Sequence, residues 1–167
     1  MRDLIRAKLL AIEKQYNIKI LYACESGSRG WQFASPDSDY DVRFIYTQPL
    51  NNYLSIVNVE DNISFPINDE LDIYGWDIGK VLKLMGKSNT TAFEWLQSPI
   101  VYFEEAGFKE NLWNLCQSYF SSKSNIHHYL GIAKGALDTA CADHQIKIKK
   151  LFYILSNFRR LPNFTNE

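Results

Sequence analysis

The sequence predicts an α+β fold in which a short mixed sheet comes first along the chain and helices come last. Three apolar runs in the first half, at residues 18–24, 42–46 and 71–76, have the β-branched and aromatic composition of strands. In the second half, apolar residues recur mostly at helical spacing. A chain of 167 residues with 46% hydrophobic content can bury one sizeable core. We therefore expect a core over residues 1–103 and a helical C-terminal region over residues 104–167.

The composition restricts the classes of function. The formal net charge of -1 argues against a broad nonspecific nucleic-acid surface, although a local basic patch stays open. Cys24, Cys116 and Cys141 are widely spaced, which fits reduced thiols better than a disulfide scaffold or a zinc site. The sequence shows no signal peptide and no apolar span of membrane length. We therefore expect a cytoplasmic protein without a membrane partner.

A helix is expected at the start of the chain, over residues 2–16, with Asn17 ending it. Its apolar stripe consists of Ile5, Leu9, Ile12 and Tyr16. After the second strand run, the segment 49–69 is polar and interrupted by Pro66. This pattern predicts a loop that carries one short helix or strand.

Helix signals follow the third strand run. Asp77 directly precedes apolar positions at helical spacing, so a helix N-cap is its simplest role. Thr91 and Glu94 have the spacing of a capping box, which predicts a short helix ending near Ser98-Pro99. Glu94 could instead support a functional site. The apolar positions after Asp77 are Ile78, Val81, Leu82 and Met85.

A short extended run at residues 100–103 is followed by helical patterns only. We expect one amphipathic helix, and then two further helices over residues 125–158 that are broken near Asp143-His144. The apolar positions of the first helix are Phe108, Leu112, Leu115 and Tyr119. The next two stripes are Ile126, Leu130, Ala133 and Leu137, and then Ile148, Phe152 and Leu155.

The residues that carry chemistry lie between the first two strand runs. In an extended segment alternate side chains share a face, so Asp39, Asp41 and Arg43 point to the same side. The same alternation makes Asp72, on the third strand run, the natural third carboxylate. Two like charges about 4 Å apart repel by roughly 4 kcal/mol at an effective dielectric of about 20, so a nearby cation is expected. Oxygen ligands suit Mg²⁺, which commonly joins one or two carboxylates to substrate phosphates.

Gly27-Ser28 lies upstream of these acids, where backbone N–H groups and a hydroxyl could cradle phosphates. A calcium-binding EF-hand is excluded, because Val42 would stand where glycine is required and Gln48 where glutamate is required. A solvated acidic turn around Pro36 is the alternative that these residues alone leave open.

Several blocks of sequence resemble a known family. Gly27-Ser28, ten further residues and then Asp39-x-Asp41 resemble the signature of the DNA polymerase β nucleotidyltransferase superfamily. The string GSRGWQFASPDSDYDVRFIY, followed in order by LDIYGWDIGK, KSNTTAFEWLQSPIVY and HHYLGIAKG, is similar to one branch of it. That branch comprises the predicted bacterial nucleotidyltransferases related to YcgL and the RNA-repair-associated polymerase β family. The resemblance spans residues 20–155 and rests on separate blocks that agree.

The resemblance implies a polymerase β-like core, a short mixed sheet with helices, plus an α-helical C-terminal part. It implies transfer of a nucleoside monophosphate from an NTP to an acceptor hydroxyl, with RNA as one candidate acceptor, and release of pyrophosphate. Two Mg²⁺ ions, or Mn²⁺, would be held by Asp39, Asp41 and Asp72. The nucleotide would be bound by Gly27, Ser28, Arg29, Ser38 and Arg43. The alternative is a catalytically impaired nucleotide-binding or partner-binding module of the same fold.

The end of the chain departs from the pattern that the resemblance implies. Relatives continue past the segment matching residues 149–155, usually with an arginine-proline pair, whereas Ser156-Asn157 stands in that place here. The C-terminal region is therefore expected to be shortened relative to the family. Its exposed apolar side chains would favour a homo-oligomer or a partner. These side chains are Phe152, Leu155, Phe158, Leu161 and Phe164.

Overall fold

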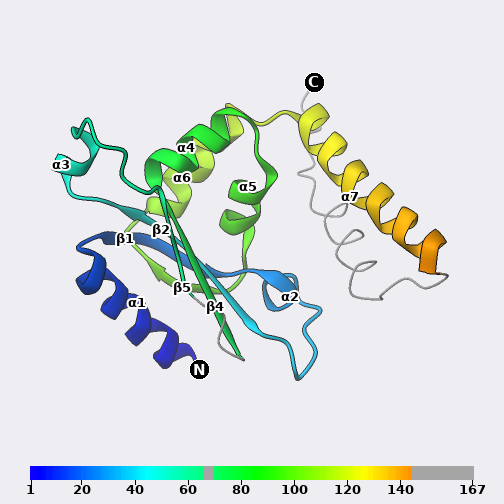
Figure 1. Ribbon diagram of the computed structural model, residues 1–167, viewed down its shortest axis with the longest axis horizontal. Helices are drawn as coiled ribbons and strands as arrows, with labels where there is room; N and C mark the ends of the chain where they lie inside the picture. Colours follow the sequence, from blue (N-terminus) through cyan, green and yellow to red (C-terminus); the bar gives the residue numbers. More distant parts are fainter. Residues whose placement is uncertain (66–69, 144–167) are drawn as a thin grey trace.

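The structure of the protein is a computed structural model that describes residues 1–65 and 70–143. Its described part contains a five-stranded mixed sheet in the order β3-β4-β2-β1-β5, with helices on both faces (Figure 1). The predicted α+β class is confirmed. The boundary expected between residues 103 and 104 stays a prediction.

The strands form where β-branched and aromatic residues cluster. Strand β2 pairs in parallel with β4, and the other neighbouring strands pair antiparallel. The two parallel strands therefore begin at the same edge of the sheet. The strands are β1 (Lys19–Glu25), β2 (Tyr40–Thr47), β3 (Asn62–Ser64), β4 (Leu71–Asp77) and β5 (Val101–Glu104).

The first helix, α1 (Arg2–Tyr16), ends as predicted at Asn17, which adopts a left-handed conformation with φ 50°. Three of the four stripe residues are buried, whereas Tyr16 is 41% exposed because it lies at the last turn. The other helices are α2 (Gly27–Gly30), α3 (Leu50–Tyr53), α4 (Ile78–Gly86), α5 (Thr90–Gln97), α6 (Phe108–Gln117) and α7 (Ser122–Asp143).

Two apolar clusters cover the two faces of the sheet. One cluster joins α1 to residues such as Leu71 and Ile73, and the other joins α4, α5 and α6 to residues such as Trp76. Alternate side chains of β4 therefore point to opposite faces of the sheet, with Leu71 and Ile73 toward α1 and Trp76 toward the other helices. Figure 1 shows the same arrangement, with α1 on one side of the sheet and α4 to α6 on the other.

Two predictions of local structure need correction. The segment 49–69 holds both a short helix, α3, and a strand, β3, in its described part. The capping box at Thr91 is wrong, because Asn89 caps α5 and its side-chain oxygen accepts the Thr91 N–H at 3.1 Å. Asparagine in an extended conformation is a favourable N-cap, so the helix begins one residue before Thr91.

The buried faces of α6 and α7 also differ from the predicted stripes. Helix α6 buries Leu112 and Cys116, whereas Leu115 is 42% and Tyr119 is 52% exposed. Helix α7 buries Asn125 and Tyr129 instead, leaving two predicted stripe residues half exposed. The Asn125 amide binds Thr90 and Ser88, which turns this side of the helix inward. The exposed stripe residues are Ile126 and Leu130, at 40% and 50%.

The remaining C-terminal predictions, the last helix and its apolar patch, lie outside the described residues. Among the residues that are described, none of the helices combines the length and apolar character needed to cross a membrane.

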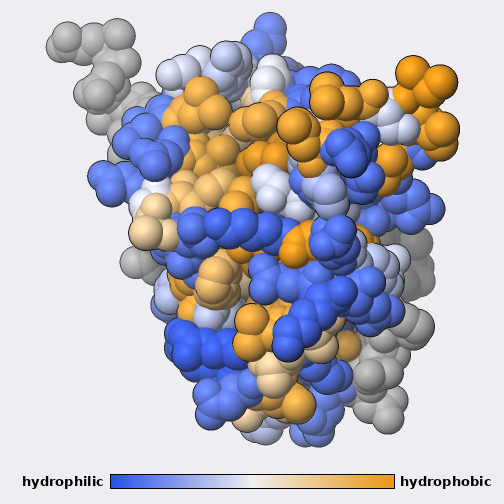
Figure 2. Space-filling model, turned by 90° about the vertical axis from the view of Figure 1, so that its left-hand side faces the viewer, coloured by the Kyte–Doolittle hydropathy of each residue, from blue (hydrophilic) through white to orange (hydrophobic). Residues whose placement is uncertain are grey.

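Exposed apolar side chains gather in the segment 50–59, which includes α3. Leu54 is 72% exposed and Val57 is 70% exposed. Helix α3 lies at the left of Figure 1, and Figure 2, which views that side, shows groups of apolar side chains between charged ones. Helix α2 lies at the opposite side of the molecule from α3 (Figure 1).

Candidate functional site

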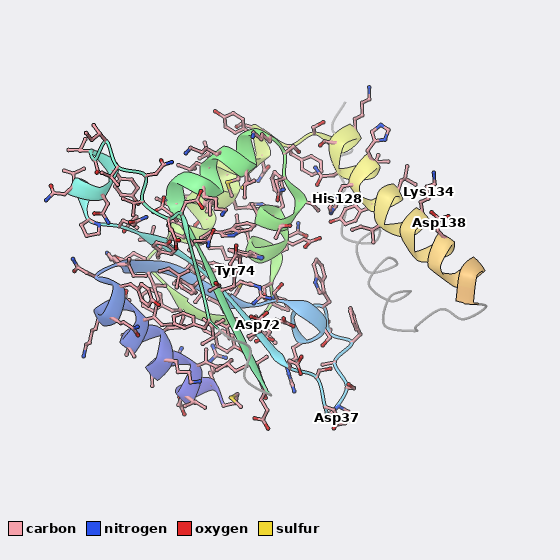
Figure 3. All side chains as sticks on the ribbon, in the orientation of Figure 1. Asp37, Asp72, Tyr74, His128, Lys134 and Asp138 are labelled. Carbon is pink, nitrogen blue, oxygen red and sulfur yellow. The ribbon has the colours of Figure 1, made fainter. Side chains whose placement is uncertain are left out.

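The candidate site lies where the parallel strands β2 and β4 begin. Asp41 and Asp72 are directly paired in the register of these strands. Side chains in register on neighbouring parallel strands point to the same face, and the strands lie about 4.8 Å apart. The two carboxylates therefore face the same space. Figure 3 shows Asp72 in the half of the sheet toward α2, whereas Asp37 lies at the tip of the loop that joins α2 to β2.

Arg43 lies between the two carboxylates. Its Nη2 donates to Asp41 Oδ1 at 3.1 Å and to Asp72 Oδ2 at 2.7 Å. Its Nη1 donates to the backbone carbonyls of Val42, at 3.1 Å, and Asp72, at 3.2 Å. As strand alternation predicted, Arg43 and Asp41 share a face. One guanidinium thus partly neutralises two acids.

The electrostatics of Asp41 show that the third predicted acid is also near. Burial raises the pKa of the Asp41 carboxyl above its ordinary value, Arg43 opposes this shift, and the charges of Asp72 and Asp39 add to it. Asp39 itself is exposed and stands in the loop just before β2. Asp39, Asp41 and Asp72 therefore contribute to one negatively charged cluster, in which Arg43 pairs with Asp41 and Asp72.

The binding of a cation by Asp39, Asp41 and Asp72 stays a prediction. Within residues 1–65 and 70–143, no three acidic, histidine or cysteine side chains converge closely enough to hold a metal ion. Arg43 takes the place between Asp41 and Asp72 instead. The donor chemistry nevertheless fits Mg²⁺ or Mn²⁺, because carboxylate oxygens suit these ions and a divalent cation would relieve the excess negative charge.

Gly27 brings the backbone of α2 close to this cluster. A Cβ atom at Gly27 would lie 1.8 Å from Asp41 Oδ2, and its φ of +50° is one that glycine tolerates best. The Ser26 N–H also donates to the Asp41 carbonyl at 2.7 Å. Only glycine can occupy this position without displacing Asp41. Ser28 follows in the same turn and is partly exposed.

Arg29 and Ser38, both predicted to bind nucleotide, order the loop before Asp39. The Arg29 guanidinium donates to the Ser38 carbonyl, at 2.7 Å from Nη2, and to the Asp39 carbonyl, at 3.1 Å from Nε. It also lies 3.9 Å from the centre of the Tyr40 ring. Ser38 Oγ accepts the Ser35 N–H at 2.9 Å. Both side chains therefore position the backbone that carries Asp39, and their contact with nucleotide stays a prediction.

Glu25 is a site residue that the sequence reasoning missed. Its side chain is completely buried, and its Oε1 accepts the Asp41 N–H at 2.8 Å while its Oε2 accepts the Tyr102 hydroxyl. Burial raises the pKa of the Glu25 carboxyl. Glu25, at the end of β1, therefore links Tyr102 of β5 to the start of β2. The available signal was an acid that follows an apolar strand run and lies two residues before Gly27.

Asp77 and Glu94 lie outside this cluster and have structural partners. Asp77 caps α4 as predicted, since its Oδ1 accepts the Gly79 N–H at 2.7 Å. Glu94 Oε1 accepts the Tyr129 hydroxyl of α7 at 3.1 Å.

Comparison with known proteins identifies the family of the chain. The profile of the RNA repair pathway DNA polymerase beta family matches residues 1–158. The chain is also 44% identical over 155 residues to the Uncharacterized protein YcgL of Bacillus subtilis (strain 168). That alignment covers 93% of this chain and 60% of the relative, so the chain spans less than two thirds of the relative's length. The resemblance seen in the motifs is confirmed, and the chain belongs to the RNA repair pathway DNA polymerase beta family.

Proposed function

We propose that the protein is a metal-dependent nucleotidyltransferase, which transfers a nucleoside monophosphate from an NTP to an acceptor hydroxyl and releases pyrophosphate. The observation that carries this proposal is the pairing of Asp41 with Asp72 beside the close backbone approach of Gly27. Membership of a DNA polymerase beta family supports the same class of reaction.

The chain's own residues have separable roles in this proposal. Gly27 and Ser28 offer backbone N–H groups and a hydroxyl to the triphosphate. Glu25 binds the backbone N–H of Asp41, and Arg29 binds the backbone carbonyl of Asp39. These backbone contacts position both aspartates. Arg43 supplies positive charge on the same face.

Asp39, Asp41 and Asp72 would hold the divalent cations. Two Mg²⁺ or Mn²⁺ ions bound there would stabilise the negative charge that develops at the α-phosphate and lower the pKa of the acceptor hydroxyl.

An RNA end is the acceptor that we favour, because the family is described as part of an RNA repair pathway. The formal net charge of -1 fits recognition of a limited RNA segment better than broad nonspecific binding.

A transfer assay tests the proposal. Purified protein is incubated with each α-³²P-labelled NTP, Mg²⁺ or Mn²⁺ and RNA with a free 3′ hydroxyl. We expect labelled RNA with wild-type protein and none with Asp41→Asn or Asp39→Asn. Asp37→Asn is the matched control, because Asp37 is exposed at the tip of the same loop and should retain wild-type turnover. Undiminished transfer by the Asp39→Asn, Asp41→Asn double variant would contradict the proposal.

The second candidate is a catalytically impaired nucleotide-binding or partner-binding module. It is favoured by the ion pairs of Arg43, which engage two of the three proposed ligands. Metal-dependent release of pyrophosphate distinguishes the two candidates, since the impaired module would bind nucleotide without producing it. Light scattering of the same samples tests the predicted self-association.

A further inference from the structure

The position of one nitrogen atom of Arg43 has consequences for cation binding. Nη2 is the donor in both ion pairs, 3.1 Å from Asp41 Oδ1 and 2.7 Å from Asp72 Oδ2. A Mg²⁺ ion held by Asp41 and Asp72 would be bound through their carboxylate oxygens, and Nη2 already contacts one oxygen of each. The guanidinium and a cation would therefore compete for the same two carboxylates.

The ion pairs of Arg43 are held firmly. The side chain is only 17% exposed, and Nη1 is anchored by the backbone carbonyls of Val42 and Asp72. The planar guanidinium donates to carbonyls through one nitrogen and to carboxylates through the other, and these bonds together fix its orientation. A cation that takes these two carboxylate oxygens must therefore displace the guanidinium.

Charge adds to the steric argument. Asp41 and Asp72 carry two negative charges against the single charge of Arg43, and Asp39 lies near enough to affect Asp41. The excess negative charge attracts a divalent cation, whereas the guanidinium repels it. Arg43 thus stabilises the cation-free arrangement and opposes cation binding at once.

We propose that Arg43 is an internal counter-ion that a divalent cation displaces when it binds Asp41 and Asp72, so that Arg43 sets the cation concentration at which the site assembles. The proposal rests on the proposed function only in assigning Asp41 and Asp72 as cation ligands. Arg43 stays tethered two residues from Asp41 on β2. Its displaced charge therefore becomes available to the phosphates of a bound nucleotide.

The test measures cation binding without nucleotide. Free Mn²⁺ is titrated by electron paramagnetic resonance against wild-type protein, Arg43→Gln and Arg43→Lys. Lys80→Gln is the matched control. Lys80 lies away from the site, and its Nζ pairs with Asp61 Oδ1 at a distance of 2.8 Å. Removal of a positive charge within about 4 Å of the cation should tighten Mn²⁺ binding by Arg43→Gln at least about tenfold. Arg43→Lys, which keeps the charge but loses the fork, should bind less tightly than Arg43→Gln, and Lys80→Gln should match wild type.

Thermal unfolding of the same proteins provides the second readout. In EDTA, Arg43→Gln should melt below wild type because two facing acids lose their counter-ion, and Mn²⁺ should raise its melting temperature more than that of wild type. If Arg43→Gln does not fold, the comparison of Arg43→Lys with wild type decides, and tighter Mn²⁺ binding by Arg43→Lys supports the proposal.

The outcomes separate this inference from the proposed function. Equal or weaker Mn²⁺ binding by the Arg43 variants overturns the displacement, even if wild-type protein catalyses metal-dependent transfer. Tighter binding by the variants supports the displacement, even if no acceptor is ever labelled. Absence of Mn²⁺ binding by every variant overturns the displacement as well.

Discussion

Strand β4 carries an aspartate near each end, and the two carboxylates have opposite surroundings. Asp77 is only 3% exposed, and its oxygens accept the Gly79 N–H at 2.7 Å and the Tyr53 hydroxyl at 2.6 Å. Asp72 is partly exposed, faces Asp41 and shares Arg43 with it. The two acids lie five residues apart on one strand but belong to different kinds of environment.

The two environments show how an acid that stabilises the fold differs from an acid of the candidate site. Neutral donors satisfy both oxygens of Asp77, so its charge stabilises a helix start and a loop. Near Asp72, acids outnumber cations, so the folded protein retains an electrostatic cost that a bound cation can relieve. Excess charge of one sign, rather than burial, marks the candidate site.

Paired substitutions at the two ends should break the comparison most clearly. Asp72→Asn should lower transfer by about 100-fold or more, because it removes a carboxylate proposed to hold the cation that stabilises the transition state, while melting temperature and nucleotide binding are kept. Asp77→Ala should cost about 1–2 kcal/mol of unfolding free energy through lost capping, with little loss of turnover per folded molecule. Thermal melts and initial rates on the same samples check both. The reverse pattern would show that the two roles are exchanged.

A pair of glycine substitutions should give the next largest effect. Gly27→Ala places a methyl group 1.8 Å from Asp41 Oδ2 at a φ of +50°, so it should displace the carboxylate and strain the backbone. We expect a stability loss of about 1–2 kcal/mol from the backbone strain alone, together with reduced transfer. Gly86→Ala is the control, because nothing lies within 4 Å of the added atom. It should be neutral or stabilise α4 by up to about 1 kcal/mol. Urea unfolding measures both, and equal tolerance at the two positions would refute the close approach.

The smallest expected effect concerns pH. Burial raises the folded-state pKa of Glu25 above its ordinary value of 4.5. Between the ordinary value and the raised value, the folded protein binds a proton that the unfolded chain has released, so stability increases as pH falls through this window. Asp41, whose pKa is also raised, contributes with the same sign.

Glu25→Gln should therefore flatten the dependence of stability on pH across that window, while keeping an acceptor for the Asp41 N–H. Urea unfolding at a series of pH values is the measurement. An unchanged pH profile in the variant would mean that Glu25 does not titrate as its burial implies.

Local patterns predicted most of the elements because they depend on neighbouring residues. The strand runs and the helix over residues 2–16 are set by side-chain spacing, and Asn17 ended that helix as expected. Where several helix starts compete, local patterns failed, since Asn89 rather than Thr91 caps α5. On α7, polar contacts of Asn125 decided the buried face against the apolar stripe.

The set of residues that could form the site follows from local sequence patterns. Strand alternation placed Asp41 and Arg43 on one face, because the side-chain period of an extended chain is independent of its partners. The three-dimensional fold alone sets the register of Asp41 with Asp72 and the contacts of Arg43 with both. It also decided the role of Glu25, whose burial between β1, β2 and β5 depends on strand pairing. Register and burial arise from contacts between segments far apart in the chain, and no local spacing encodes them.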